Sequence, residues 1–156
     1  MSKPYELKNP YEVRKKFEKA IDRIGMPIDK GILRAVVILN SLGFETSGSC
    51  EGHEDRYSTY PWIDLKFETE NSFDENRKLF FETLFKDIES FYENREVLHK
   101  NKLTFYDFTG EIFEIRLFIN SNPKISKYER EVELRNHYLE ITDFCEYLNK
   151  KYNLNY

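Results

Sequence analysis

The stretch from Gly43 to Asp64 holds most of the side-chain types in this chain that could do chemistry. Half of the six glycines lie in its first ten residues, together with one of the two cysteines and one of the three histidines. Cys50 and His53 are separated by two residues. This spacing can place two ligands on one zinc ion, or a thiol beside a general base. We therefore expect the functional site in this stretch.

Glycines flank the cysteine on both sides. Glycine lets the backbone take a positive φ or come close to a ligand, as a loop that wraps an anion or the edge of a cofactor requires. A plain turn, in which the glycines serve geometry alone, is the alternative interpretation. We favour a binding loop, with ligand contacts from Ser47, Gly48, Ser49, Glu51 and Gly52.

Four interpretations are open for Cys50. A structural zinc site needs four ligands, and no second closely spaced Cys/His pair accompanies Cys50 and His53. A metal held by these two residues and a carboxylate would need only three protein ligands. Cys50 could instead be a nucleophile with His53 as its base, or a buried and unreactive thiol. We predict no metal site from the sequence. If the protein does bind a metal ion or act in catalysis, we expect Cys50 and His53 to be the residues involved.

Aromatic and charged residues follow the loop. Trp62 and Asp64 should share one face of a strand whose other face carries Ile63 and Leu65. A planar ligand could stack on Trp62 while Arg56 meets an anionic group. Whether Arg116 joins them depends on the order of the strands, which the sequence does not reveal.

The elements that must position these residues can be read from hydrophobic periodicity. Apolar side chains at helical spacing predict helices over residues 11–24, 28–42, 73–98 and 126–152. Alternation predicts strands from residue 44, over 62–69, and in a hairpin of 103–108 with 112–120. Cys145 lies in an apolar seam of the last helix, so we expect it in the core, whereas His99 and His137 have charged neighbours and are expected on the surface.

Short links between consecutive strands predict an antiparallel sheet. We expect an α+β fold, a two-layer sandwich in which about four strands carry helices packed mainly on one face. The 156 residues suit a single globular domain, with no repeat or linker that would divide them.

Composition narrows the class of protein. No long apolar run and no signal peptide are seen, and two cysteines are too few for a disulfide framework, so we expect a cytoplasmic protein without a membrane segment. The net charge of −4 argues against non-specific binding to nucleic acid. Its distribution is uneven, since the part up to Arg34 carries +4 and the remainder −8. A basic first helix could touch an anionic partner, although such a face is more often simply solvated.

The motifs around the loop resemble a known family. The third wybutosine-synthesis protein, a tRNA methyltransferase family that uses S-adenosylmethionine, has an N-terminal helix with Phe and Lys, an Ile-Asp pair opening a second helix, and then Thr-x-Ser-Cys-x-Gly. This chain offers these elements over about residues 14–53, with Phe17, Lys19, Asp22, Ile28, Asp29, Asn40, Thr46 and the run from Ser47 to Gly52. The family follows its glycine with arginine, where His53 stands here. The run Ser-Cys-Glu-Gly-His with a Pro-Trp strand resembles more closely small bacterial or phage proteins of unassigned function.

Three functional hypotheses result. The first is a small protein that binds a polar ligand, nucleotide-like or derived from nucleic acid, at the loop around Cys50. The second is an enzyme, either a hydrolase or an RNA-modifying transferase, that depends on Cys50 and His53 or on S-adenosylmethionine; zinc is the other cofactor considered. The third is a homo-oligomeric interaction module. The sequence does not decide whether the protein is an enzyme.

Overall fold

The computed structural model describes residues 5–19, 28–53, 60–66, 75–93, 95–96, 101–107, 114–121 and 126–156. Within these ranges the chain forms four helices and four strands. The helices are α1 (Pro10–Glu18), α2 (Lys30–Ser41), α3 (Glu75–Glu93) and α4 (Lys127–Lys151). The strands are β1 (Glu45–Cys50), β2 (Trp62–Lys66), β3 (Leu103–Asp107) and β4 (Glu114–Ile119).

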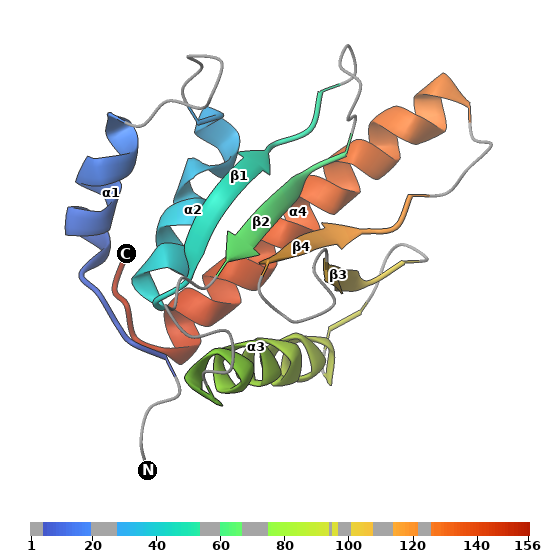
Figure 1. Ribbon diagram of the computed structural model, residues 1–156. Coiled ribbons are helices and arrows are strands. Elements are labelled where there is room, and N and C mark those ends of the chain that lie inside the picture. Colours follow the sequence, from blue (N-terminus) through green and yellow to red (C-terminus); the bar gives the residue numbers. More distant parts are fainter. Residues whose placement is uncertain are drawn as a thin grey trace.

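The strands form one antiparallel sheet in the order β1-β2-β4-β3. Helices α2 and α4 lie behind this sheet, and α3 runs along its lower border (Figure 1). The α+β class predicted from the sequence is therefore confirmed. None of the helices in the described ranges combines the length and the apolar character that a membrane crossing needs.

The core lies between the helices and one face of the sheet. Ile63 and Leu65 of β2 and Ile115 and Leu117 of β4 are completely buried, as the alternation of these strands predicts. The aromatic stripe of α3 contributes Phe80, Phe81 and Phe91 to the same cluster, and α4 contributes Ile141, Phe144, Cys145 and Leu148. The prediction that Cys145 lies in the core is thus confirmed.

The helix ends follow local chemistry. The Asn9 side chain caps α1 by accepting from the backbone N–H of Tyr11 at 2.9 Å, and Pro10 occupies the first turn, where no N–H is needed. Gly43, with φ of 104°, ends the turn after α2 in a conformation that favours glycine. Ser126 caps α4 through Glu129. The predicted extensions of the first helix to residue 24 and of the second strand to residue 69 lie outside the described residues.

Candidate functional site

The Cys50 loop begins where β1 ends. Cys50 is the last residue of the strand, and the chain bends just beyond it at Gly52, whose φ is 90°. The Gly52 N–H donates to the Cys50 sulfur at 3.4 Å. A positive φ at this point is accessible to glycine without strain, so the glycine fixes the bend that turns the backbone amide back onto the sulfur.

Asp29, at the start of α2, meets this loop from the other side. Its Oδ2 lies 3.1 Å from Nε2 of His53 and accepts the Glu51 backbone N–H at 3.1 Å. One ligand atom each from Asp29, Cys50 and His53 lie within 4.8 Å of one another. The structure thus joins Cys50 and His53, which the sequence singled out for a metal or for catalysis, to Asp29, which the sequence marked only as part of the family resemblance. The three side chains form what we call the Cys50 site.

The start of α2 is capped in an unusual way. Asp29 occupies the N-cap position but makes no side-chain cap hydrogen bond. The Gly31 N–H instead donates to the carboxylate of Glu51 at 2.8 Å, and the Gly31 carbonyl accepts from the Tyr138 hydroxyl at 2.8 Å. Glu51 of the loop therefore caps α2 in place of Asp29. The Asp29 carboxylate lies close to Cys50 and His53 instead.

A second group of predicted site residues lies on the sheet face away from the core, which we call the Trp62 face. Strand pairing puts Asp64 between Gly48 and Arg116, and the next row places Trp62 beside Cys50 and Phe118. Arg116 donates two hydrogen bonds, of 2.7 and 3.0 Å, to the Asp64 carboxylate. Its guanidinium also lies over the Trp62 ring, 4.0 Å from the centroid. The order of the strands thus brings Arg116 to Trp62.

Glycine at position 48 leaves room for the indole ring of Trp62. A Cβ there would lie 3.2 Å from the Trp62 ring, closer than ordinary van der Waals contact allows. The register shift between Thr46 and Gly48 marks a bulge, and Ser47 within it donates to Glu114 of β4 at 2.8 Å. Bulges often re-aim a side chain in this way. Ser49 pairs with Ile63 and so belongs to the opposite face of the sheet.

The remaining predictions have mixed outcomes. The expectation that His137 lies on the surface is wrong, because its side chain is only 1% exposed. Its ring packs against Tyr60, with centroids 4.9 Å apart, and its Nε2 lies 3.4 Å from Glu133. Burial and the charge of Glu133 raise the pKa of Tyr60. Arg56 and His99 lie outside the described residues.

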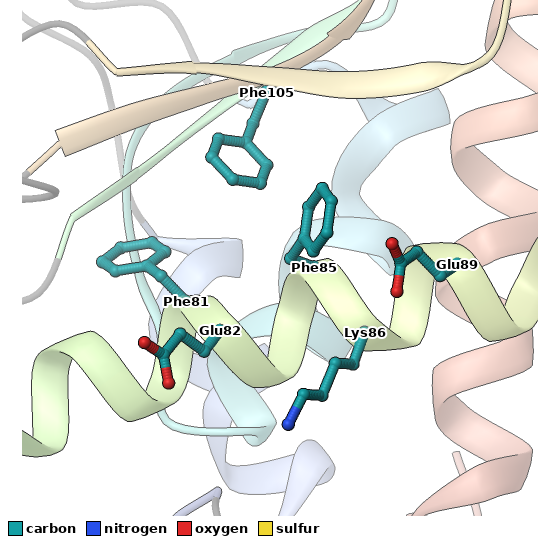
Figure 2. Close-up of a pocket in the computed structure, with 6 residues that line it drawn as sticks. All are labelled: Phe81, Glu82, Phe85, Lys86, Glu89 and Phe105. Carbon is teal, nitrogen blue, oxygen red and sulfur yellow. The ribbon is translucent and has the colours of Figure 1, made fainter.

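A surface hollow of about 310 Å³ lies between α3 and β3. Phe81 and Phe85 point from the helix toward the sheet, and Phe105 points back toward them (Figure 2). Phe85 is 50% exposed, so this aromatic residue of α3 lies at the surface and not in the core. Because β2 and β4 separate β3 from β1 in the sheet, this apolar hollow is distinct from the Cys50 site.

No protein-family model, curated protein or solved structure matches this chain. The family resemblance described above stays a prediction. Function must therefore be inferred from the two groups of residues themselves.

Proposed function

We propose that this protein binds a small polar ligand of nucleotide type, which lies on the Trp62 face and reaches the loop around Cys50. The observation that carries this proposal is the pairing of Cys50 with Trp62 across β1 and β2, because it makes the polar loop and the aromatic surface neighbours. Nucleobases are recognised by stacking on aromatic rings and guanidinium planes, together with polar contacts to their edges.

The Trp62 face supplies both kinds of contact. Trp62, Phe118 and the 56% exposed Tyr106 belong to three adjacent strands, with Arg116 among them. Asp64 holds the guanidinium of Arg116 in a fixed plane. The net charge of −4 favours a single nucleotide-like molecule over a long polyanionic strand.

Intrinsic fluorescence tests the proposal directly, because Trp62 is the only tryptophan in the chain. The protein is titrated with a panel of nucleosides, nucleotides and S-adenosylmethionine, and quenching is checked by calorimetry. Loss of one aromatic stack costs about 1–3 kcal/mol, so calorimetry on Trp62→Ala should show affinity reduced roughly 5- to 150-fold. Tyr128→Ala, at a residue of α4 that is 74% exposed, is the matched control and should bind normally. No quenching by any member of the panel, together with no calorimetric signal, would refute the proposal.

A second candidate is a hydrolase or transferase that depends on Cys50 and His53. The specific observation in its favour is the 3.1 Å contact between Asp29 and His53, since a carboxylate that orients a histidine is common to nucleophilic triads and to metal sites. Loss of turnover in both Cys50→Ser and His53→Ala, on a substrate found by the ligand panel, is the expected result.

The remaining candidate, a homo-oligomer, is favoured only by the exposure of Phe85 beside the apolar hollow. Light scattering of the protein and of Phe85→Ser separates this candidate from the first, because an interface there should give an oligomer that the substitution disrupts. We also propose a cytoplasmic location. Both cysteines are free thiols, as is usual in a reducing compartment.

A further inference from the structure

The Cys50 site brings together three different types of metal ligand. Sulfur from Cys50, nitrogen from His53 and oxygen from Asp29 lie within 4.8 Å of one another. Ions such as Mg²⁺ and Ca²⁺ prefer oxygen ligands, whereas Zn²⁺ is commonly held by cysteine, histidine and carboxylate together. The donor set therefore favours zinc over Mg²⁺ and Ca²⁺.

The spacing of the three atoms also fits. Tetrahedral zinc with bonds of about 2.0–2.3 Å places its ligand atoms roughly 3.3–3.6 Å apart. His53 Nε2 and Asp29 Oδ2 are already 3.1 Å apart, and the remaining separations do not exceed 4.8 Å. The set is therefore close to the spacing of a zinc site and would have to contract slightly to bind the ion.

The surroundings orient the ligands as the second shell of a metal site does. The Gly52 N–H donates to the Cys50 sulfur, and the Glu51 N–H donates to the Asp29 carboxylate. The start of α2 does not use Asp29 as its cap, because Glu51 provides the acceptor for the Gly31 N–H. The Asp29 carboxylate thus contacts the Cys50 loop and does not cap the helix, which is the usual role of an aspartate at this position.

Access to the site is one-sided. Cys50 is only 8% exposed, whereas the side chains of Asp29 and His53 are each 21% exposed. An ion bound there would have its sulfur ligand on the protein side and its nitrogen and oxygen ligands toward solvent. Three protein ligands with one position left for water or substrate is the arrangement of catalytic zinc sites.

We propose that Asp29, Cys50 and His53 bind one zinc ion, with the fourth coordination position left for water or for a ligand. Ligand binding on the Trp62 face does not require this ion, so either proposal can fail alone. Because zinc binds the thiolate, binding releases the Cys50 proton to solvent.

The experiment uses the full chain, freed of metal by a chelator under reducing conditions. Titration with Zn²⁺ by calorimetry should give one site per chain, and Co²⁺ in its place should give the visible absorption of a tetrahedral ion with a thiolate-to-cobalt charge-transfer band. Cys50→Ser, His53→Ala and Asp29→Asn should each lower the zinc affinity about 100-fold or more, since even second-shell changes cost 10- to 100-fold. Cys145→Ala, which removes the other thiol of the chain, is the matched control and should keep both the stoichiometry and the cobalt spectrum.

Two results would overturn the proposal. One is a wild-type protein that takes up no zinc, or whose cobalt spectrum lacks the charge-transfer band. The other is a folded Cys50→Ser variant, checked by circular dichroism, that binds zinc as tightly as the wild type. The cobalt spectrum of the wild type decides the question even where a variant does not fold. Quenching of Trp62 by nucleotides in the metal-free protein, measured in parallel, keeps the outcome for the ligand proposal separate.

Discussion

Gly31 offers a sharp test of how α2 and the Cys50 loop are joined. A Cβ at this position would lie 2.2 Å from Oε2 of Glu51, a distance that non-bonded atoms do not adopt. The Glu51 carboxylate would have to leave, and with it the hydrogen bond of 2.8 Å that it accepts from the Gly31 N–H. Gly31→Ala is therefore a substitution that should remove the helix cap by steric exclusion.

The expected size of the effect is the difference between two contributions. Loss of a charge-assisted cap costs about 1–2 kcal/mol. Replacing glycine by alanine in a helix gains up to about 1 kcal/mol, and less in the first turn than in the interior. We expect Gly31→Ala to lower the free energy of unfolding by about 1 kcal/mol, although the same substitution in most helices raises it.

A double-mutant cycle with Glu51→Ala identifies the cause. Once the carboxylate is absent, Gly31→Ala should stabilise the protein by about 0.5 kcal/mol, so the coupling energy between the two positions should be about 1.5 kcal/mol. Urea denaturation followed by Trp62 fluorescence measures all four proteins. If Gly31→Ala changes stability equally with and without Glu51, the carboxylate does not cap α2 and our account of the loop is wrong.

Three further predictions concern the core and the Trp62 face. Asp87 is 2% exposed, accepts from the Tyr5 hydroxyl at 2.9 Å and the Tyr152 hydroxyl at 2.7 Å, and forms an ion pair of 2.6 Å with Lys151. Asp87→Ala should therefore lower the free energy of unfolding by about 3–5 kcal/mol in urea denaturation; a loss under about 1 kcal/mol would contradict this. Burial, together with Asp87, raises the pKa of Tyr5 and of Tyr152 in the folded protein. The free energy of unfolding should therefore be constant below the ordinary tyrosine pKa of about 10 and fall as the pH rises above it. The fall should be weaker in Tyr152→Phe. Measuring the free energy of unfolding against pH for the wild type and for Tyr152→Phe checks this. Equal slopes would show that Tyr152 does not contribute to the pH dependence. Arg116→Lys should lose the cation–π contact of the guanidinium with Trp62, lower the free energy of unfolding by about 1 kcal/mol and shift the tryptophan emission; an unchanged spectrum would show that this contact is absent in solution.

Much of the fold could be predicted from the sequence because its signals are local. The alternation of Ile63 and Leu65 marks the buried face of β2, and Gly43 marks the end of α2 without any knowledge of the rest of the chain. The meeting of Arg116 with Trp62 could not be predicted in the same way. It depends on the insertion of β4 between β2 and β3, which is decided by packing over the whole sheet.

Two residues make tertiary contacts that the local sequence does not reveal. An aspartate directly before a helix usually acts as an N-cap, so the local sequence gives no sign of the contact of Asp29 with His53. His137 lies among polar residues of α4, so the sequence favoured the surface. Its ring is instead buried against Tyr60, which follows the Cys50 loop in the chain. In both cases a tertiary contact replaces the role that the local sequence indicates.

The position of the Cys50 site follows from the matched lengths of α2 and β1. The helix has 12 residues and rises about 18 Å, and the strand has 6 residues and spans about 20 Å. The chain reverses at Gly43 between them, and the two elements pack against each other, so the end of the strand returns to the level at which the helix began. Asp29 and Cys50 must then lie at the same end of the unit, although 20 residues separate them. An added residue in the turn would leave both elements intact but shift their ends relative to each other. It should therefore weaken the zinc binding that we propose for the Cys50 site more than it weakens the fold.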